Sequence, residues 1–341
     1  MASVTADYSE ITKSLGYMFS EILSASNSIS FFQSLAFGII AMVLVGGSWC
    51  FVGYIMGKAP KNNIDTNVIQ FFTALFSVIT SLVIAWINSS WVTGITNSIA
   101  IYACISYFLS GMLGFCQLQI MSKAMQTGPN GVIWSIIQAG CVAPFIVSIV
   151  FFDVVLTWTR GLGISMLLAS LVLFVFTKDN ERKGGNLWLL ESFICFGVVA
   201  IQQNLVNWPS YYEEATKLSS IVRTLCVATG TLTISILYTI FKITPEQKQV
   251  IISSIKNRKL WIYVISLQFI SLLVAYTLHY PGMDVMAAFN RGGMCYPLMV
   301  GSCIVFFSLI SILILKEKIR LIQLLAIAIC VTGLIMICTS A

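Results

Sequence analysis

Charged residues are scarce in this sequence. Lys and Arg together number 19 and Asp and Glu 13 among 341 residues, so that 9% of the chain is charged while 58% is apolar. Soluble domains carry about 25% charged residues, and a chain this poor in charge could not cover a water-facing surface. Its mean hydropathy of +0.91 indicates that the lipid bilayer is its solvent, where each segment of about 20 apolar residues forms one spanning helix.

The residues of metal and nucleotide chemistry are also few. The chain has one histidine, His279, which cannot build a zinc site alone. It has no G-x-x-x-x-G-K-[ST] sequence to hold nucleotide phosphates. The ten cysteines form no C-x-x-C pair and fall in apolar segments, where cysteine behaves as a small hydrophobe. We therefore expect no enzyme activity, no catalytic residue, no metal and no cofactor.

Ten apolar segments are long enough to span a membrane. They are continuous apolar runs and not ten-residue alternations, so they favour helices over the strands of a barrel. A helix also satisfies its own backbone hydrogen bonds, as lipid requires. We predict an all-α polytopic membrane protein with about ten transmembrane helices at residues 33–57, 66–88, 97–121, 131–152, 160–177, 187–206, 220–241, 261–279, 286–314 and 320–339.

The first 31 residues differ from the rest. Apolar side chains recur there at spacings of three and four, which predicts an amphipathic helix on the membrane or on the bundle. These side chains are Tyr8, Ile11, Leu15, Met18, Phe19, Ile22 and Leu23. We treat residues 1–31 as an N-terminal tail, and an ordered tail without a function of its own would show the same pattern.

The basic residues predict an orientation. By sequence position, 14 of the 19 Lys and Arg lie in loops that follow an odd-numbered predicted span. Loops on the cytoplasmic side carry the excess of Lys and Arg. This places the odd loops in the cytoplasm and both termini on the non-cytoplasmic side of a multi-pass cell membrane protein.

The sequence also contains a weak internal repeat at half its length. With a shift of 160 residues, Arg160 falls on Arg320, each at the tight turn before the last span of its half. A basic loop at 179–186 separates a first half, 32–178, from a second half, 187–341. Because each half has five spans, an odd number, the two halves must be inverted relative to each other. Inverted repeats are typical of secondary transporters, with the substrate site between the halves near the midplane.

Several stretches resemble the drug/metabolite transporter superfamily, with its EamA-like ten-helix transporters. The stretch from Leu315 through Lys316-Glu317-Lys318-Ile319-Arg320 to Gln323 and Gly333 is similar to the closing motif of that superfamily, although Ala326 stands where the family usually has Gly. Residues 112–152 resemble its third and fourth helices. Gly46-Gly47-Ser48-Trp49 and the basic loop 58–61 are similar to the L-rhamnose–proton symporter branch. The resemblance covers about residues 35–339 and implies ten helices in a five-plus-five arrangement.

Polar side chains inside the spans are the candidate site residues. Amides can donate and accept hydrogen bonds to a neutral polar solute, and aromatic faces pack against the C–H faces of sugars. The candidate substrate-binding residues are Ser48, Trp49, Gln117, Trp134, Gln138, Gln203, Asn204, Asn207, Trp208, Arg223, Gln268, Asn290 and Arg291. The alternative for each amide is a bond between helices, worth about 0.6 kcal/mol. The alternative for each arginine is to reach the membrane surface.

Glu191 is the candidate proton carrier, because it lies within the sixth predicted span. An ionised side chain at the bilayer centre costs about 2.5–3.5 kcal/mol on insertion scales. Such a residue is therefore a candidate functional group, although Glu191 lies near a span end and could reach the interface instead.

These observations predict a secondary active transporter of a small polar metabolite. The amide-rich, aromatic-lined spans favour a sugar or polyhydroxy compound taken up with protons. Export or exchange of amino acids, drugs or other metabolites is the alternative, and an integral-membrane enzyme or lipid-handling protein is a remote one. The expected partners are the substrate, protons and membrane lipid, with no nucleic acid, and the protein is expected to be a monomer or homodimer.

Overall fold

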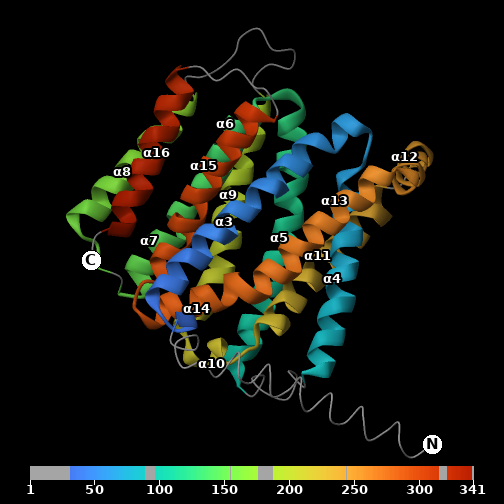
Figure 1. Ribbon diagram of the computed structural model, residues 1–341. Coiled ribbons are helices and arrows are strands. Elements are labelled where there is room, and N and C mark those ends of the chain that lie inside the picture. The colour runs from blue at the N-terminus through green and yellow to red at the C-terminus, as the bar shows by residue number, and fades with distance from the viewer. Residues whose placement is uncertain are drawn as a thin grey trace, which may run out of the picture.

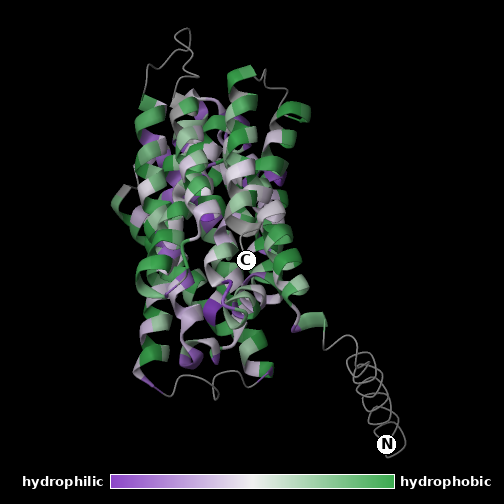
Figure 2. Cartoon of the chain, turned by 90° about the vertical axis from the view of Figure 1, so that its left-hand side faces the viewer, coloured by the Kyte–Doolittle hydropathy of each residue, from purple (hydrophilic) through white to green (hydrophobic). Residues whose placement is uncertain are grey.

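The computed structural model describes residues 31–88, 97–153, 155–175, 187–242, 244–314 and 321–339. Within these ranges the chain is helical and has no strand. The helices form an elongated bundle, and hydrophobic residues predominate along its length (Figure 1, Figure 2). The predicted all-α class is confirmed. The predicted amphipathic tail up to residue 30, the basic linker 179–186 and the turn 315–320 lie outside the described residues.

The longer helices follow the apolar segments of the sequence. Short 3-10 stretches, η1 (Pro60–Asn62), η2 (Ala139–Cys141), η3 (Trp208–Tyr211) and η5 (Gly292–Met294), and one π-helix, η4 (Phe269–His279), join or interrupt them. The described α-helices are α3 (Leu35–Lys58), α4 (Thr66–Ile87), α5 (Ser98–Thr127), α6 (Asn130–Gln138), α7 (Val142–Phe151), α8 (Trp158–Val175), α9 (Leu187–Asn207), α10 (Glu213–Thr216), α11 (Ser220–Lys242), α12 (Pro245–Lys256), α13 (Arg258–Gln268), α14 (Tyr280–Ala288), α15 (Cys295–Leu313) and α16 (Leu321–Thr339).

Eight helical segments in the described ranges are long and apolar enough to cross a membrane, so the chain is an all-α polytopic membrane protein. They are Leu35–Lys58, Thr66–Ile87, Ser98–Thr127, Asn130–Phe151, Leu187–Tyr211, Ser220–Phe241, Arg258–Ala288 and Gly292–Ile310. The predicted fifth and tenth spans fall on α8 and α16, which are not among these eight. The apolar stretch found in α16, Leu324–Gly333, is shorter. These two helices pack against each other at one edge of the bundle (Figure 1).

The sequence prediction ended the eighth span too early. It placed the end at residue 279 and the next start at 286, whereas the helix continues to Ala288 and the ninth segment begins at Gly292. Pro281 does not end the helix, because it stands where the π-helix η4 passes into α14, and π-helical adjustment of the backbone lets a membrane helix continue past a proline. The break comes at Asn290, whose φ of 56° lies in the left-handed region.

Polar caps explain where several helices begin. The side chains of Ser34, Asp65 and Asn97 accept hydrogen bonds from backbone N–H groups in the first turns of α3, α4 and α5. Thr244 does the same for α12 and Asn257 for α13. Such caps satisfy N–H groups that have no partner within the helix. In a chain this apolar, they mark the ends of hydrophobic runs.

Three glycines allow helix backbones to touch. A Cβ atom placed on Gly46, Gly111 or Gly230 would lie 1.9–2.0 Å from a carbonyl oxygen of the facing helix. Gly46 lies where α3 crosses α15, and Gly111 and Gly230 face each other's helices where α5 crosses α11. Small residues permit such approaches between membrane helices. These crossings hold the centre of the bundle together.

The basic residues gather at one end of the bundle. Successive long helices alternate in direction (Figure 1), so the connections from α3 to α4, from α5 to α6 and from α11 to α13 share that end. The described basic residues in or near these connections are Lys58, Lys61, Lys123, Lys248, Lys256, Arg258 and Lys259. The opposite connections carry Arg160, Lys217 and Arg291.

Candidate functional site

A cavity of about 300 Å³ lies inside the bundle. Its wall is formed by α3, α4, α5, α6, α9, α11, α15 and the continuous segment α13–η4–α14, and therefore by helices from both halves of the chain. The volume is at the lower end of the range of about 300–1,000 Å³ that is typical of small-molecule pockets. The lining is mainly apolar, with hydroxyl and amide side chains among the apolar ones. A small ligand with both polar and apolar faces would match it.

Lining side chains from three α-helices and from η4 carry polar atoms without a hydrogen-bond partner. These side chains are Gln70, Thr73, Ser110, Gln203 and His279. The atoms are both amide atoms of Gln70, the hydroxyls of Thr73 and Ser110, Oε1 of Gln203 and Nε2 of His279. Each of these residues is at most 9% exposed. Because buried polar groups nearly always have a hydrogen-bond partner, these atoms mark positions where a polar ligand or water would bind.

Carboxylates, lysines and arginines are absent from the described lining of the cavity. The titratable side chains there are His279, Tyr280 and Tyr296. A carboxylate or ammonium group of a ligand would therefore lose its hydration without gaining an opposite charge, which is costly in a buried site. The lining is suited to an uncharged ligand.

One wall of the cavity is aromatic. The ring of Trp49 on α3 meets His279 edge-on, with centroids 5.8 Å apart and planes at 89°. His279 stacks on Tyr280, with centroids 5.1 Å apart and planes at 16°. Beyond Tyr280, outside the cavity, the guanidinium carbon of Arg223 lies 5.6 Å from the centre of the tyrosine ring. The wall thus connects the cavity to a buried cation.

Arg223 is held by the backbone and by one carboxylate. It is 1% exposed and donates to the carbonyl oxygens of Leu218 at 2.9 Å and Thr216 at 2.8 Å. Its Nη1 atom donates to Oδ1 of Asp284 on α14, also at 2.9 Å. The arginine therefore ties the start of α11 and the loop before it to α14.

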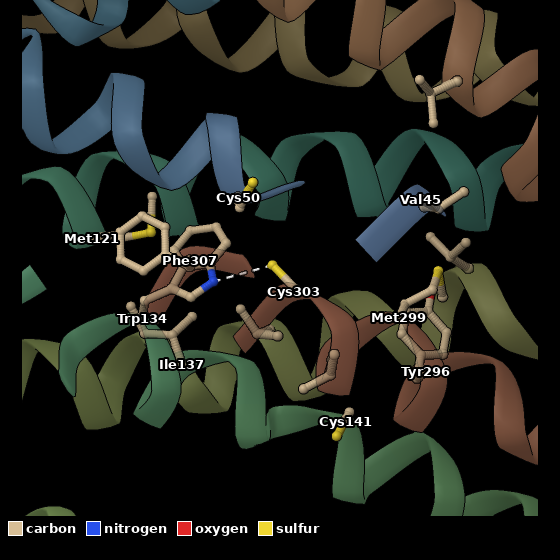
Figure 3. Close-up of a cluster of buried hydrophobic side chains, with 14 of the residues drawn as sticks. Val45, Cys50, Met121, Trp134, Ile137, Cys141, Tyr296, Met299, Cys303 and Phe307 are labelled. Atoms are coloured by element: carbon tan, nitrogen blue, oxygen red, sulfur yellow. Dashed lines mark hydrogen bonds between the residues drawn. The ribbon is translucent and has the colours of Figure 1, made fainter. Parts of the chain in front are cut away.

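Trp134 lies at the seam between α3, α6 and α15. Its indole N–H donates to Sγ of Cys303 at 3.2 Å, and its ring packs against Phe307 at a centroid distance of 5.2 Å (Figure 3). Gln138, one turn later on α6, also donates to Cys303, at 3.8 Å. Both residues line the cavity, but their polar donors already have a sulfur partner.

Of the candidates from the sequence, Trp49, Gln117, Trp134, Gln138 and Gln203 line the cavity. These five come from α3, α5, α6 and α9. The other candidate residues are absent from its described lining.

Four of these other candidates bond to nearby groups instead. Ser48 donates to the carbonyl of Val45 at 2.7 Å, and Asn204 to that of Ala200 at 2.8 Å. The remaining two form contacts between helices, with Asn207 donating to Ser148 at 3.5 Å and Trp208 donating to Ser106 at 2.8 Å.

Three further candidates lie in other positions. Gln268 bridges α13 to α4, with its amide atoms 2.8 Å from the Ser77 hydroxyl and 3.2 Å from the Thr80 hydroxyl. Asn290 is exposed in the turn before η5. Arg291, also in that turn, places Nη1 3.7 Å from Sδ of Met294.

Glu191 is 7% exposed, and its Oε1 atom lies 2.7 Å from Nζ of Lys123 on α5. It is not among the residues that line the cavity. The lysine side chain is 70% exposed and the glutamate side chain 9% exposed, so the pair lies at the edge of the bundle. The candidate proton carrier is thus separate from the cavity.

Sequence reasoning did not identify the polar face of α4. Gln70, Thr73 and Ser77 line the cavity, and Ser81, four residues further, is also buried. Their spacing of three and four places them on one face of a helix. This stripe was the available signal, because a polar stripe on an otherwise apolar span faces protein and not lipid.

No family model matches the chain, and no curated protein sequence matches it. A solved structure described only as "Crystal structure of protein" is similar to the chain, with 14% sequence identity and a TM-score of 0.56. The similarity covers 86% of this chain and 95% of that chain. At this identity the likeness shows a shared fold alone.

Proposed function

We propose that this chain is a secondary active transporter of a small neutral polar metabolite, and that its cargo is a sugar or similar polyhydroxy compound taken up with protons. The observation that carries the proposal is the internal cavity, with its unpartnered polar atoms and no charged residue in its described lining. Hydroxyl groups both donate and accept hydrogen bonds. A polyhydroxy molecule can therefore satisfy the Gln70 amide, the Thr73 and Ser110 hydroxyls and the Gln203 carbonyl together.

The uncharged lining also disfavours amino acids as cargo. An amino acid carries a carboxylate and an ammonium group, and each needs an opposite charge or a cluster of donors when it is buried. The described lining supplies hydroxyls, amides and aromatic rings. Trp49 offers an indole face of the kind that packs against sugar C–H groups.

The helix contacts support ten spans in two inverted halves, 32–178 and 187–341, with α8 and α16 as the fifth and tenth. An inverted repeat pairs each span of the first half with one of the second: α3 with α9, α4 with α11, α5 with the segment α13–η4–α14, α6–α7 with α15, and α8 with α16. Under this pairing, the contact of α5 with α9 corresponds to that of α3 with η4 and α14. Likewise, the contact of α3 with α15 corresponds to that of α9 with α6 and α7. All of these contacts are present. The contacts α4–α11 and α8–α16 are also present, and each of them joins two helices that are equivalent in the two halves. Inverted repeats with a site between them are typical of secondary transporters.

The proposed orientation places the basic end of the bundle in the cytoplasm, following the excess of Lys and Arg there. The cavity then lies between the two membrane faces, lined by helices of both halves. Its position is that expected for a substrate site in a transporter of inverted repeats.

Purified protein in proteoliposomes tests the proposal. We expect counterflow of at least one labelled sugar or polyol from a panel, together with a thermal shift of the protein by the same compound. Absence of both across the panel would overturn it. A blocked variant, Ala228→Phe, fills the cavity from α11 and should abolish both signals. Leu237→Phe, at an exposed apolar position on the same helix, is the matched control and should retain them.

A further inference from the structure

His279 has a combination of properties that no other described lining residue shares. Among the titratable lining residues, it is the one whose neutral ring carries a nitrogen lone pair that can bind a proton, whereas the neutral phenols of Tyr280 and Tyr296 already hold theirs. It is the single histidine of the chain. Its Nε2 atom is buried and has no hydrogen-bond partner. Among the described lining residues, the imidazole is therefore the evident base for a proton that enters this cavity.

The groups around His279 determine what its charge would affect. From α3 it meets Trp49, and from α4 the nearby lining residues are uncharged. From α11 the charged neighbour is Arg223, and from α14 come Tyr280 and the Asp284 carboxylate. The other titratable groups of this region are the phenols of Tyr107 on α5, whose ring meets Tyr280 at a centroid distance of 5.6 Å, and Tyr296 on α15.

A positive charge on His279 would change this balance. With a neutral imidazole, the region holds one cation, Arg223, and one anion, Asp284, 2.9 Å apart. Protonation adds a second cation, linked to the first through the ring of Tyr280. Like charges repel strongly in a buried site. The new cation repels Arg223 and attracts the Asp284 carboxylate, so it competes with Arg223 for that carboxylate and weakens the tie between α11 and α14.

We propose that His279 is the proton-accepting group of this site and that its charge acts on the Arg223–Asp284 ion pair. In the proton step, the lone pair of the unprotonated ring nitrogen binds a proton from water on one side of the membrane, and the same N–H bond breaks to release it to the other side. The inference deepens the proposed function and rests on it. It assigns to His279 the role that the sequence suggested for Glu191, whose partner is Lys123 outside the cavity lining.

The test compares His279→Gln with Glu191→Gln in proteoliposomes, using a sugar that the wild-type protein carries. Glutamine keeps a polar group of similar reach but cannot take up a proton near neutral pH. Two rates are measured for each protein: uptake driven by an imposed proton gradient, and counterflow without a gradient. We expect the ratio of uptake with and without the gradient to fall to unity in His279→Gln, at whatever counterflow rate that variant shows, and Glu191→Gln to keep the wild-type ratio.

Other outcomes separate the two proposals. Wild-type counterflow without any response to a proton gradient would overturn the role of His279 and leave transport standing. A wild-type ratio in His279→Gln, or a ratio of unity in Glu191→Gln alone, would also overturn it. Absence of counterflow in the wild-type protein would overturn the proposed function as well. His279→Asn is the second variant if His279→Gln does not fold, as judged by its elution as a single species in detergent.

Discussion

Replacing Gly46 with alanine tests how closely the two central helices pack. The added Cβ would lie 1.9 Å from the carbonyl oxygen of Met299 and 2.2 Å from Oγ of Ser302, both on α15. Ordinary contact begins at 3.4 Å. The serine hydroxyl can rotate away, but the carbonyl belongs to the backbone of α15 and cannot. The variant therefore has to separate α3 from α15.

The expected loss can be derived from two opposing effects. Restoring ordinary contact needs a separation of about 1.5 Å, which opens gaps in a close-packed interior. Extra methyl groups in packed cores cost about 1–3 kcal/mol, and a contact this short belongs at the upper end. Alanine returns up to about 1 kcal/mol through its higher helix propensity. We expect a net loss of about 1–2 kcal/mol in the free energy of unfolding.

The assay is unfolding of the purified protein in detergent, followed by tryptophan fluorescence. Gly197→Ala on α9 is the matched control, because a Cβ there would meet nothing within 4 Å. That variant gains helix propensity without a clash and should be more stable than wild type by about 0.5–1 kcal/mol. If Gly46→Ala and Gly197→Ala had the same free energy of unfolding, the argument that α3 and α15 touch through their backbones at Gly46 would be refuted.

Two further predictions concern the cavity and the ion pair behind it. Thr73→Val removes an unpartnered hydroxyl, so stability should be unchanged or slightly higher in thermal unfolding, while titration should show sugar binding weaker by about 2- to 12-fold. Undiminished binding would remove Thr73 from the site. Arg223→Met leaves Asp284 unpaired and should lose about 3–5 kcal/mol. Asp284→Asn keeps an acceptor for Arg223 on a side chain that is 26% exposed and should lose less. If the variant with both Arg223→Met and Asp284→Asn lost the sum of the two single losses in unfolding free energy, Arg223 and Asp284 would not interact.

Much of the helical architecture is predictable because lipid imposes a simple rule. A segment of about 20 apolar residues must be helical and must cross, and eight of the predicted spans correspond to such helices. The end of the eighth helix was harder to predict. Pro281 resembles a stop in sequence, but the π-helix η4 just before it lets the helix continue.

The site was predictable only in part, because side-chain direction depends on packing. Trp49, Gln117 and Gln203 line the cavity, as their polar or amphipathic character inside apolar helices suggested. Arg223 was expected as a substrate-binding residue. Its guanidinium bonds instead to carbonyls of the loop before α11, and no periodicity in the sequence describes the path of a loop.

The glycine crossings also determine which parts of the bundle can move as one body. Gly46 joins α3 to α15, Gly111 and Gly230 join α5 to α11, and Gly333 places α16 directly on the backbone of α8. Each of these pairs contains one helix from either half of the chain. A tilt of one whole half against the other would pull all three pairs apart at their closest contacts. In the proposed transporter, opening to alternate sides of the membrane would therefore move each mixed pair as a unit. Sliding would occur between pairs, where side chains and not backbones form the boundary.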